Sequence, residues 1–115
     1  LLARFVDAEV AGVDFVSGEG LLMAPTIAVS RLLKRNRLSL QDFDFYEIHE
    51  AFAGQVLCTL KAWESATYCK AVLDLEKPLG PIDRSKINTR GGSVALGHPF
   101  GATGARIVGA LAKML

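Results

Sequence analysis

The sequence has 115 residues, of which half are hydrophobic, with a mean hydropathy of +0.29 and a formal net charge of +1 at pH 7. This is enough apolar material for the core of one domain, and it excludes a disordered or low-complexity chain. A near-neutral chain without a long basic block does not favour nucleic-acid binding. No uncharged apolar run approaches the roughly 20 residues that cross a bilayer.

The cysteines indicate the cellular compartment of the protein, and the two ends of the sequence indicate whether it is part of a longer chain. Cys58 and Cys69 show no spacing typical of a metal or redox pair, so we expect a reduced, cytoplasmic chain. Cys58 lies among apolar residues of a predicted helix and is expected to be a small core residue. The sequence lacks an initiator Met and a signal peptide, and it ends without a polar tail. We therefore expect a piece of a longer protein.

The first half of the chain alternates between strand-like and helix-like segments. Residues 4–15 are rich in Val, Phe and Ala and predict a largely buried strand. A helix is predicted from Pro25, because proline suits a first helical turn, to a basic cluster near Asn36. Residues 44–48 predict a short aromatic strand that leads directly into a second helix reaching Trp63.

The second half continues the alternation after a less regular stretch. Residues 66–75 are compatible with a further helix, and the two prolines and the glycine of residues 77–81 predict a loop. A third strand is predicted at residues 86–88 and a final helix at residues 102–115. Strands that alternate with helices predict an α/β fold with mostly parallel neighbours and right-handed crossovers.

A glycine-rich segment, residues 88–104, holds five glycines together with His98 and Pro99. Glycine serves where φ is positive or where another group approaches the backbone, and Pro99 stiffens the turn that carries His98. The pattern is neither a Walker loop nor a dinucleotide-binding motif. Gly101 and Gly104 are also compatible with close packing of a helix on a sheet. Because ligands bind at the carboxyl ends of parallel strands, we favour a functional role.

His49 is the second of the two histidines, and it also lies where a predicted strand meets a helix. Two neutral imidazoles at such turns can donate to one carbonyl oxygen, as in an oxyanion hole. A purely structural histidine is the alternative. A metal site that includes a carboxylate such as Glu50 is disfavoured, because no His-x-x-x-His or Cys pair supports it. The sequence offers no evident nucleophile for either histidine to activate.

The two histidine segments together resemble one family. The sequence His-Glu-Ala-Phe at 49–52 resembles the Asn/His-Glu-Ala-Phe motif of thiolases. Residues 88–104 resemble the thiolase motif Asn-x-x-Gly-Gly-x-x-x-x-Gly-His-Pro-x-Gly-x-(Ser/Thr)-Gly. The resemblance implies an αβαβα-layered fold of which residues 1–115 form an incomplete C-terminal domain, with about three strands and three main helices. The last two strands would follow residue 115.

The resemblance also implies a reaction. Thiolases cleave a 3-oxoacyl-CoA with CoA into acetyl-CoA and a shortened acyl-CoA through an acyl-cysteine intermediate. The nucleophilic cysteine would lie in a preceding N-terminal half, and a second catalytic cysteine would follow residue 115. Histidine at position 49 and the long connection 62–88 resemble the β-subunit of trifunctional enzymes and bacterial β-oxidation thiolases. A biosynthetic acetyl-CoA acetyltransferase, a non-catalytic thiolase-like lipid-binding protein and an acyl-CoA-binding module are the alternatives.

Residue roles follow from the resemblance alone. His98 would activate the cysteine and donate to the thioester oxygen, and His49 would complete the oxyanion hole in place of an Asn that holds a water. Phe52 would pack beside the pantetheine end of CoA, Leu21 replaces a Met that lines the acyl pocket, and Gly97 would contact CoA. CoA is then a substrate and no resident cofactor or metal is expected. Implied partners are the rest of the parent chain, further copies in a dimer or tetramer, and a hydratase/dehydrogenase subunit.

Overall fold

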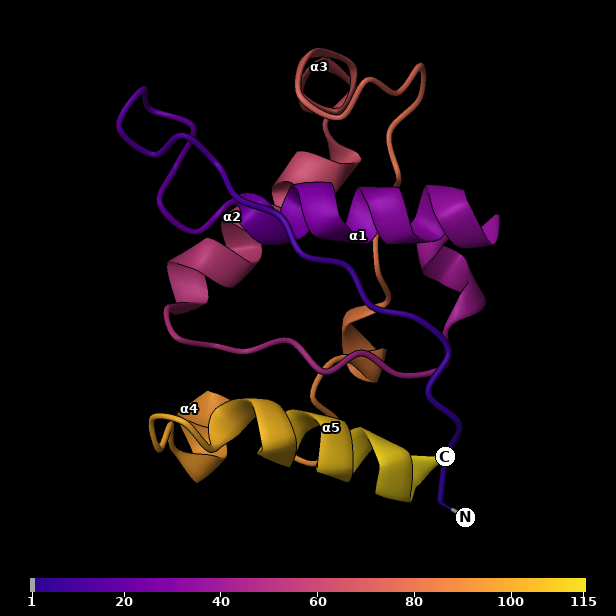
Figure 1. Cartoon of the computed structure of the whole chain (residues 1–115), viewed down its shortest axis with the longest axis vertical. Helices are drawn as coiled ribbons and strands as arrows, with labels where there is room; N and C mark the ends of the chain where they lie inside the picture. The colour runs from indigo at the N-terminus through magenta and orange to yellow at the C-terminus, as the bar shows by residue number, and fades with distance from the viewer. Residues whose placement is uncertain (1) are drawn as a thin grey trace.

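Helices flank extended segments in the computed structural model, which describes residues 2–115. The helices are α1 (Ala24–Asn36), η1 (Leu40–Asp42), α2 (Ala53–Glu64), α3 (Ala66–Ala71), η2 (Arg84–Lys86), α4 (Ser93–Leu96) and α5 (Thr103–Met114), of which η1 and η2 are 3-10 turns. Figure 1 shows α1, α2 and α3 on one side, extended chain in the middle, and α4 and α5 on the other side. The chain therefore has a layered arrangement.

The main helices lie where the sequence predicts them. Helix α1 has a proline in its first turn and ends at Asn36, and the capping residue Arg37 has a left-handed φ of 56° that closes the last turn. Helix α2 begins directly after Phe52, and α5 begins at Thr103. Of the compatible stretch 66–75, only Ala66–Ala71 is helical. No helix within residues 2–115 combines the length and apolarity that a bilayer span requires.

The predicted second and third strands are neighbours, but they pair at one position only. Tyr46 and Ile87 form a single parallel bridge, in which Tyr46 N–H donates to Lys86 O at 3.0 Å and Asn88 N–H donates to Tyr46 O at 2.8 Å. The parallel direction of this pairing agrees with the prediction, whereas the paired stretch is shorter than the predicted strands. The turn η2 ends at Lys86 and Asn88 has a positive φ of 49°, so only one residue between them is extended.

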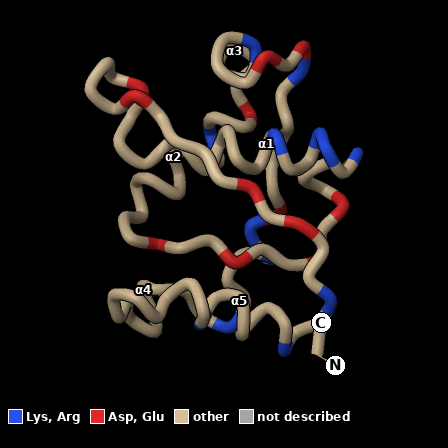
Figure 2. Tube along the Cα trace, in the orientation of Figure 1, with Lys and Arg blue, Asp and Glu red and all other residues tan. Residues whose placement is uncertain are grey.

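The prediction of a buried strand at residues 4–15 is wrong for this structure. This segment has no ladder partner among the described residues, and Phe5 and Val10 are 78% and 85% exposed. Side chains hold it instead: Arg35 at the end of α1 donates to Asp7 Oδ2 and Ala8 O, both at 2.9 Å. Arg35 forms ion pairs with Asp7 and Glu9, and Figure 2 shows red acidic positions along this first extended segment and blue basic positions along α1. An extended segment becomes a strand only when another backbone pairs with it.

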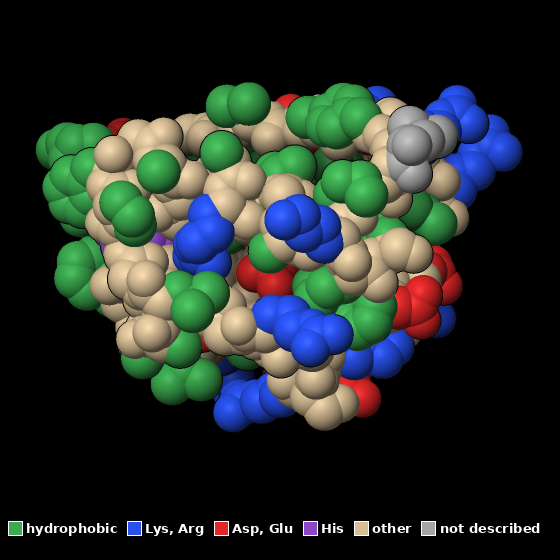
Figure 3. Space-filling view, turned by 90° about the horizontal axis from the view of Figure 1, so that it is seen from below, with side chains coloured by type: hydrophobic (Ala, Val, Ile, Leu, Met, Phe, Trp, Pro, Cys, Tyr) green, Lys and Arg blue, Asp and Glu red, His purple; other side chains and the backbone are tan. Residues whose placement is uncertain are grey.

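The core lies between α1, α2 and the loops that cover them. It is built from Leu33, Leu40, Leu60, Trp63 and Ile82, all buried. Helix α5 contributes none of these residues, and its Val108 is 64% exposed. From the α5 side, hydrophobic side chains lie open on the surface between Lys and Arg side chains (Figure 3).

The expectation that Cys58 is a core residue is also wrong. Cys58 is exposed, whereas Cys69 at the end of α3 is fully buried. The buried residues of α2 are confined to its C-terminal half, from Thr59 to Trp63, so Cys58 lies just outside the packed part of the helix.

Residues 1–115 expressed alone are expected to self-associate. Each apolar side chain that leaves water contributes about 1.5–3 kcal/mol, which is a large share of a typical domain stability of about 5–15 kcal/mol. Light scattering should show oligomers, and Val10→Glu should raise the monomer fraction because Val10 is 85% exposed on the unpaired segment. A monodisperse wild-type monomer with a cooperative thermal transition would contradict this expectation.

Candidate functional site

Asn88 fastens the two histidine-bearing segments to each other. Its Oδ1 accepts from Ile48 N–H at 2.8 Å, while its Nδ2 donates to Ile48 O at 2.9 Å and to Glu50 Oε1 at 2.8 Å. The φ of Asn88 is 49°, a left-handed conformation that Asn tolerates better than most residues. The Asn88 side chain therefore pairs with both backbone groups of Ile48, as a neighbouring strand would, and also binds the Glu50 carboxylate.

Glu50 completes this connection from the other segment. Its Oε2 accepts from Val94 N–H at 3.0 Å in α4. Gly92 makes room for the carboxylate, because a Cβ at position 92 would overlap Glu50 Oε2 and lie 2.6 Å from Asn88 Nδ2. The Val94 amide, followed by the Asn88 amide, lowers the pKa of Glu50 despite burial. Both carboxylate oxygens are thus engaged by N–H donors, which makes Glu50 a structural partner.

The two imidazoles lie next to each other, as the sequence predicts. The ring centroids of His49 and His98 are 4.2 Å apart, and their planes are tilted by 50°. His49 Nδ1 lies 2.8 Å from Ser93 Oγ, and His98 Nδ1 lies 2.7 Å from Thr103 Oγ1. Each ring therefore uses Nδ1 for a buried hydroxyl, and within residues 2–115 neither Nε2 has a hydrogen-bond partner. Both Nε2 atoms are therefore available to hydrogen-bond to a bound molecule.

The environment of His49 keeps the imidazole neutral. Burial lowers the pKa of His49, and electrostatic interactions with His98 and with the positive Arg106 lower it further, while Glu50 opposes them. A neutral imidazole carries one N–H donor and one acceptor nitrogen. His49 can therefore donate a hydrogen bond near pH 7 without carrying a charge.

The turn that carries His98 depends on glycine. Gly97 has a φ of 91°, which a side chain would strain, although open space surrounds the position of a Cβ. The ring of Phe100 lies 4.7 Å from that of His98. Gly97 does not line a cavity with the other predicted residues, so its observed part is to shape the turn.

A cavity of about 410 Å³ opens beside the histidine pair and brings together three of the predicted residues. Leu21, His49 and Phe52 line it, together with apolar residues from α1 and α2. Leu21 and Phe52 are 69% and 65% exposed, so the cavity is open to solvent at their end. His98 does not line this cavity; its ring lies against that of His49 at a tilt of 50°. Three of the five predicted residues thus line one apolar cleft, and His98 reaches it only through its contact with His49.

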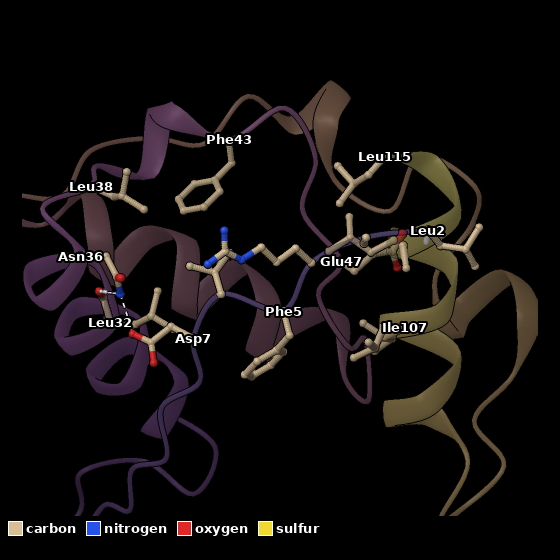
Figure 4. A pocket seen from close by; sticks show the side chains of 16 residues that line it. Leu2, Phe5, Asp7, Leu32, Asn36, Leu38, Phe43, Glu47, Ile107 and Leu115 are labelled. Carbon is tan, nitrogen blue, oxygen red and sulfur yellow. Dashed lines mark hydrogen bonds between the residues drawn. The ribbon is translucent and has the colours of Figure 1, made fainter.

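A larger cavity, of about 740 Å³, is lined by neither histidine, although Glu47 lines both cavities. Figure 4 shows it between the end of α1, with Asn36 and Leu38, and the α5 wall, with Ile107 and Leu115. Glu47 lies on the α5 side, and both of its carboxylate oxygens are buried without a hydrogen-bond partner among residues 2–115. Burial raises the pKa of Glu47, which the positive charge of Arg106 partly offsets. The cavity is a packing gap under the unpaired first segment.

Three residues at the site were not singled out by the sequence reasoning. Ser93 and Thr103 are 7% and 6% exposed, and Arg106 Nη2 donates to Ser93 Oγ at 2.9 Å. All lie within or just after the glycine-rich segment. The sequence signal that could have pointed to Ser93 and Thr103 is a small hydroxyl residue between glycines, because a hydroxyl that is buried there must find a hydrogen-bond partner.

Comparison with known proteins places the chain in a family. A profile described as "Thiolase, C-terminal domain" matches residues 1–115, so the chain belongs to the thiolase family. It is 46% identical over 87 residues to a probable 3-ketoacyl-CoA thiolase of Caenorhabditis elegans, a match that covers 76% of this chain and 19% of that protein. It is 43% identical over 95 residues to the mitochondrial trifunctional enzyme subunit beta of Bos taurus, covering 83% and 20%. The chain spans about a fifth of the length of these relatives.

Solved structures agree with the family assignment. Peroxisomal 3-ketoacyl-CoA thiolase of Saccharomyces cerevisiae, described as a five-layered α-β-α-β-α structure, superposes with a TM-score of 0.73 at 37% identity, covering 97% of this chain and 27% of that one. An acetyl-CoA acetyltransferase from Syntrophomonas wolfei gives 0.59 at 34% identity, covering 81% and 21%. The layered α/β class predicted from the sequence is confirmed, although the chain itself is mostly helical.

Asn88→Gly in the full-length protein is expected to destabilise the domain by about 1–3 kcal/mol. Glycine accepts the left-handed backbone, so the change removes only the side chain and leaves two backbone groups and a carboxylate short of a partner. Chemical denaturation measures the effect. Asp74→Gly is the matched control, because Asp74 also has a positive φ, of 53°, and it is exposed. Equal stability of the two variants would show that the Asn88 side chain is dispensable.

Proposed function

We propose that this chain is part of a degradative 3-oxoacyl-CoA thiolase that acts in fatty-acid β-oxidation. The observation that carries the proposal is the adjacent, tilted pair of His49 and His98, in which a hydroxyl engages each Nδ1 and no described residue hydrogen-bonds to either Nε2. Two imidazoles 4.2 Å apart at the edge of an apolar cleft suit an oxyanion that develops on a bound thioester. The named relatives support the degradative direction.

The proposed chemistry gives each histidine one task. His98 takes the thiol proton of a cysteine that the rest of the parent chain supplies, and the thiolate attacks the 3-oxo carbon. The C2–C3 bond then breaks, and its electron pair moves to the thioester oxygen as an enolate. Donors on His98 and neutral His49 stabilise that oxygen until the second catalytic cysteine expected in the parent chain gives its proton to C2, which forms acetyl-CoA. A second CoA then gives its thiol proton to the thiolate of that second cysteine, and the CoA sulfur takes the shortened acyl group from the nucleophilic cysteine. His98 returns its proton to the nucleophilic cysteine.

The cleft suits the rest of the substrate. Leu21 and Phe52 present apolar surface at the open end of the cavity of about 410 Å³, where the acyl chain and the pantetheine arm would lie. CoA takes part as a substrate, and the proposed steps involve no resident cofactor. We also propose that the parent protein is a homo-oligomer in contact with a hydratase/dehydrogenase subunit. The cytoplasmic location expected from the cysteines stays a prediction.

A biosynthetic acetyl-CoA acetyltransferase is the second candidate, because the same oxyanion hole serves the reverse Claisen condensation. The similarity to an acetyl-CoA acetyltransferase structure supports it. Turnover of the full-length protein with short and long 3-oxoacyl-CoA substrates in both directions would separate the two candidates. Efficient cleavage of long chains supports the degradative enzyme, and efficient condensation of two acetyl-CoA molecules supports the biosynthetic one.

His98→Ala in the full-length protein is expected to abolish thiolysis almost completely. Loss of one oxyanion donor typically costs about 10²–10³ in rate, and this change removes the base as well. The loss is measured as the steady-state rate of cleavage of a 3-oxoacyl-CoA, monitored by the decrease of its enolate absorbance. Lys113→Ala is a suitable control, because Lys113 is exposed on the same helix that carries Thr103. Turnover of His98→Ala within a few fold of the control would overturn the proposed function.

His49→Asn is expected to retain more activity than His49→Ala. An Asn amide can hold a water that donates in place of the imidazole, whereas Ala leaves that place to disordered solvent. The ratio of kcat values between the two variants, with thermal melts to verify folding, measures the difference. Equal activities would show that residue 49 does not supply an oxyanion donor.

A further inference from the structure

We infer that Ser93, held by Arg106, is a positioning residue that fixes His49 in the tautomer with its proton on Nε2. The inference rests on the proposed function, because it explains how one imidazole of the pair becomes a donor. Ser93 Oγ lies 2.8 Å from His49 Nδ1 and 2.9 Å from Arg106 Nη2. Ser93 is only 7% exposed, so solvent does not compete freely for its hydroxyl.

The direction of these hydrogen bonds follows from the number of donors. A serine hydroxyl has one hydrogen and two lone pairs, and an arginine guanidinium can only donate. Arg106 therefore occupies one lone pair of Ser93 Oγ. Among the described residues, the Ser93 hydroxyl has no acceptor other than His49 Nδ1. Buried polar hydrogens are satisfied in folded proteins, so the Ser93 hydroxyl donates to Nδ1, and the imidazole proton is on Nε2.

Thr103, the hydroxyl partner of His98, differs from Ser93 because its hydroxyl has a second acceptor within reach. Thr103 Oγ1 lies 2.7 Å from His98 Nδ1 and has a second acceptor, Pro99 O, at 3.4 Å. The threonine hydroxyl can therefore donate to Pro99 O while it accepts from His98 Nδ1–H. His98 can thus hold its proton on either nitrogen, as a base that takes and returns a proton requires. Only His49 is fixed as a donor.

Arg106 stabilises the same arrangement through its charge. The charged groups that act on His49 are Arg106, His98 and Glu50, and the first two disfavour a second proton on the ring. Glu47 lies within electrostatic range of Arg106 without an ion pair, and the Nε and Nη1 of Arg106 have no partner in the described structure. The one hydrogen bond that the guanidinium makes among the described residues is therefore the one from Nη2 to Ser93 Oγ.

The test combines kinetics with a direct reading of the tautomer in the full-length protein. Ser93→Ala should lower kcat about 10–100-fold with a smaller change in KM, because part of the population loses its donor, and a lost donor costs about 10²–10³. Ser93→Thr, which keeps the hydroxyl, should restore most of the rate. Two-bond ¹H–¹⁵N spectra of ¹⁵N-histidine-labelled protein should show His49 protonated on Nε2 in wild type and a mixture in Ser93→Ala.

A double-mutant cycle separates positioning from a general structural effect. In the His49→Asn background there is no tautomer to fix, so Ser93→Ala should have almost no further effect on kcat. An equal loss in both backgrounds, or an unchanged His49 spectrum in Ser93→Ala, would overturn the inference. This failure is distinct from failure of the proposed function, which would appear as activity retained by His98→Ala. If Ser93→Thr does not fold, the spectra and the cycle with Ser93→Ala still decide.

Discussion

The position of both histidines depends on the hydrogen bonds between Asn88 and the segment of Ile48 and Glu50. In a sheet, many ladder bonds hold neighbouring segments in register, but here the parallel pairing is limited to one bridge at Tyr46. The Asn88 side chain continues that pairing for two residues, and Glu50 extends it to the amide of Val94. Because these are charge-assisted or partly buried bonds, they define the geometry more strictly than a flexible loop contact does.

The chemistry follows from what this connection brings together. Once residues 48–50 and 92–94 are fixed against each other, Ser93 lies at His49 Nδ1 and the Gly97 turn places His98 over the His49 ring. The two rings share a site but have different partners, and the difference divides the work between a fixed donor and a reversible base. Burial and neighbouring positive charge lower the pKa of His49, which preserves the neutral donor.

The sequence predicts the helices and the histidine pair, because helical periodicity and strand-end position are local signals. It fails at residues 4–15, since a strand needs a pairing partner and apolar composition does not reveal whether one is present. It fails at Cys58 because helix periodicity does not show how far along α2 the packing extends. The Ser93–Arg106 contact joins residues 13 apart across a turn, and no local pattern specifies which donor meets which acceptor. The roles carried over for Gly97, Phe52 and Leu21 stay predictions.

The central claim is that two Nε2 atoms converge on one substrate oxygen. A crystal structure of the full-length protein with a non-hydrolysable 3-oxoacyl-CoA analogue tests it most directly. The account predicts the thioester oxygen within about 2.7–3.1 Å of Nε2 of both His49 and His98, with Ser93 still bound to His49 Nδ1. An oxygen held by backbone amides or by other side chains, with either imidazole turned away, would contradict it.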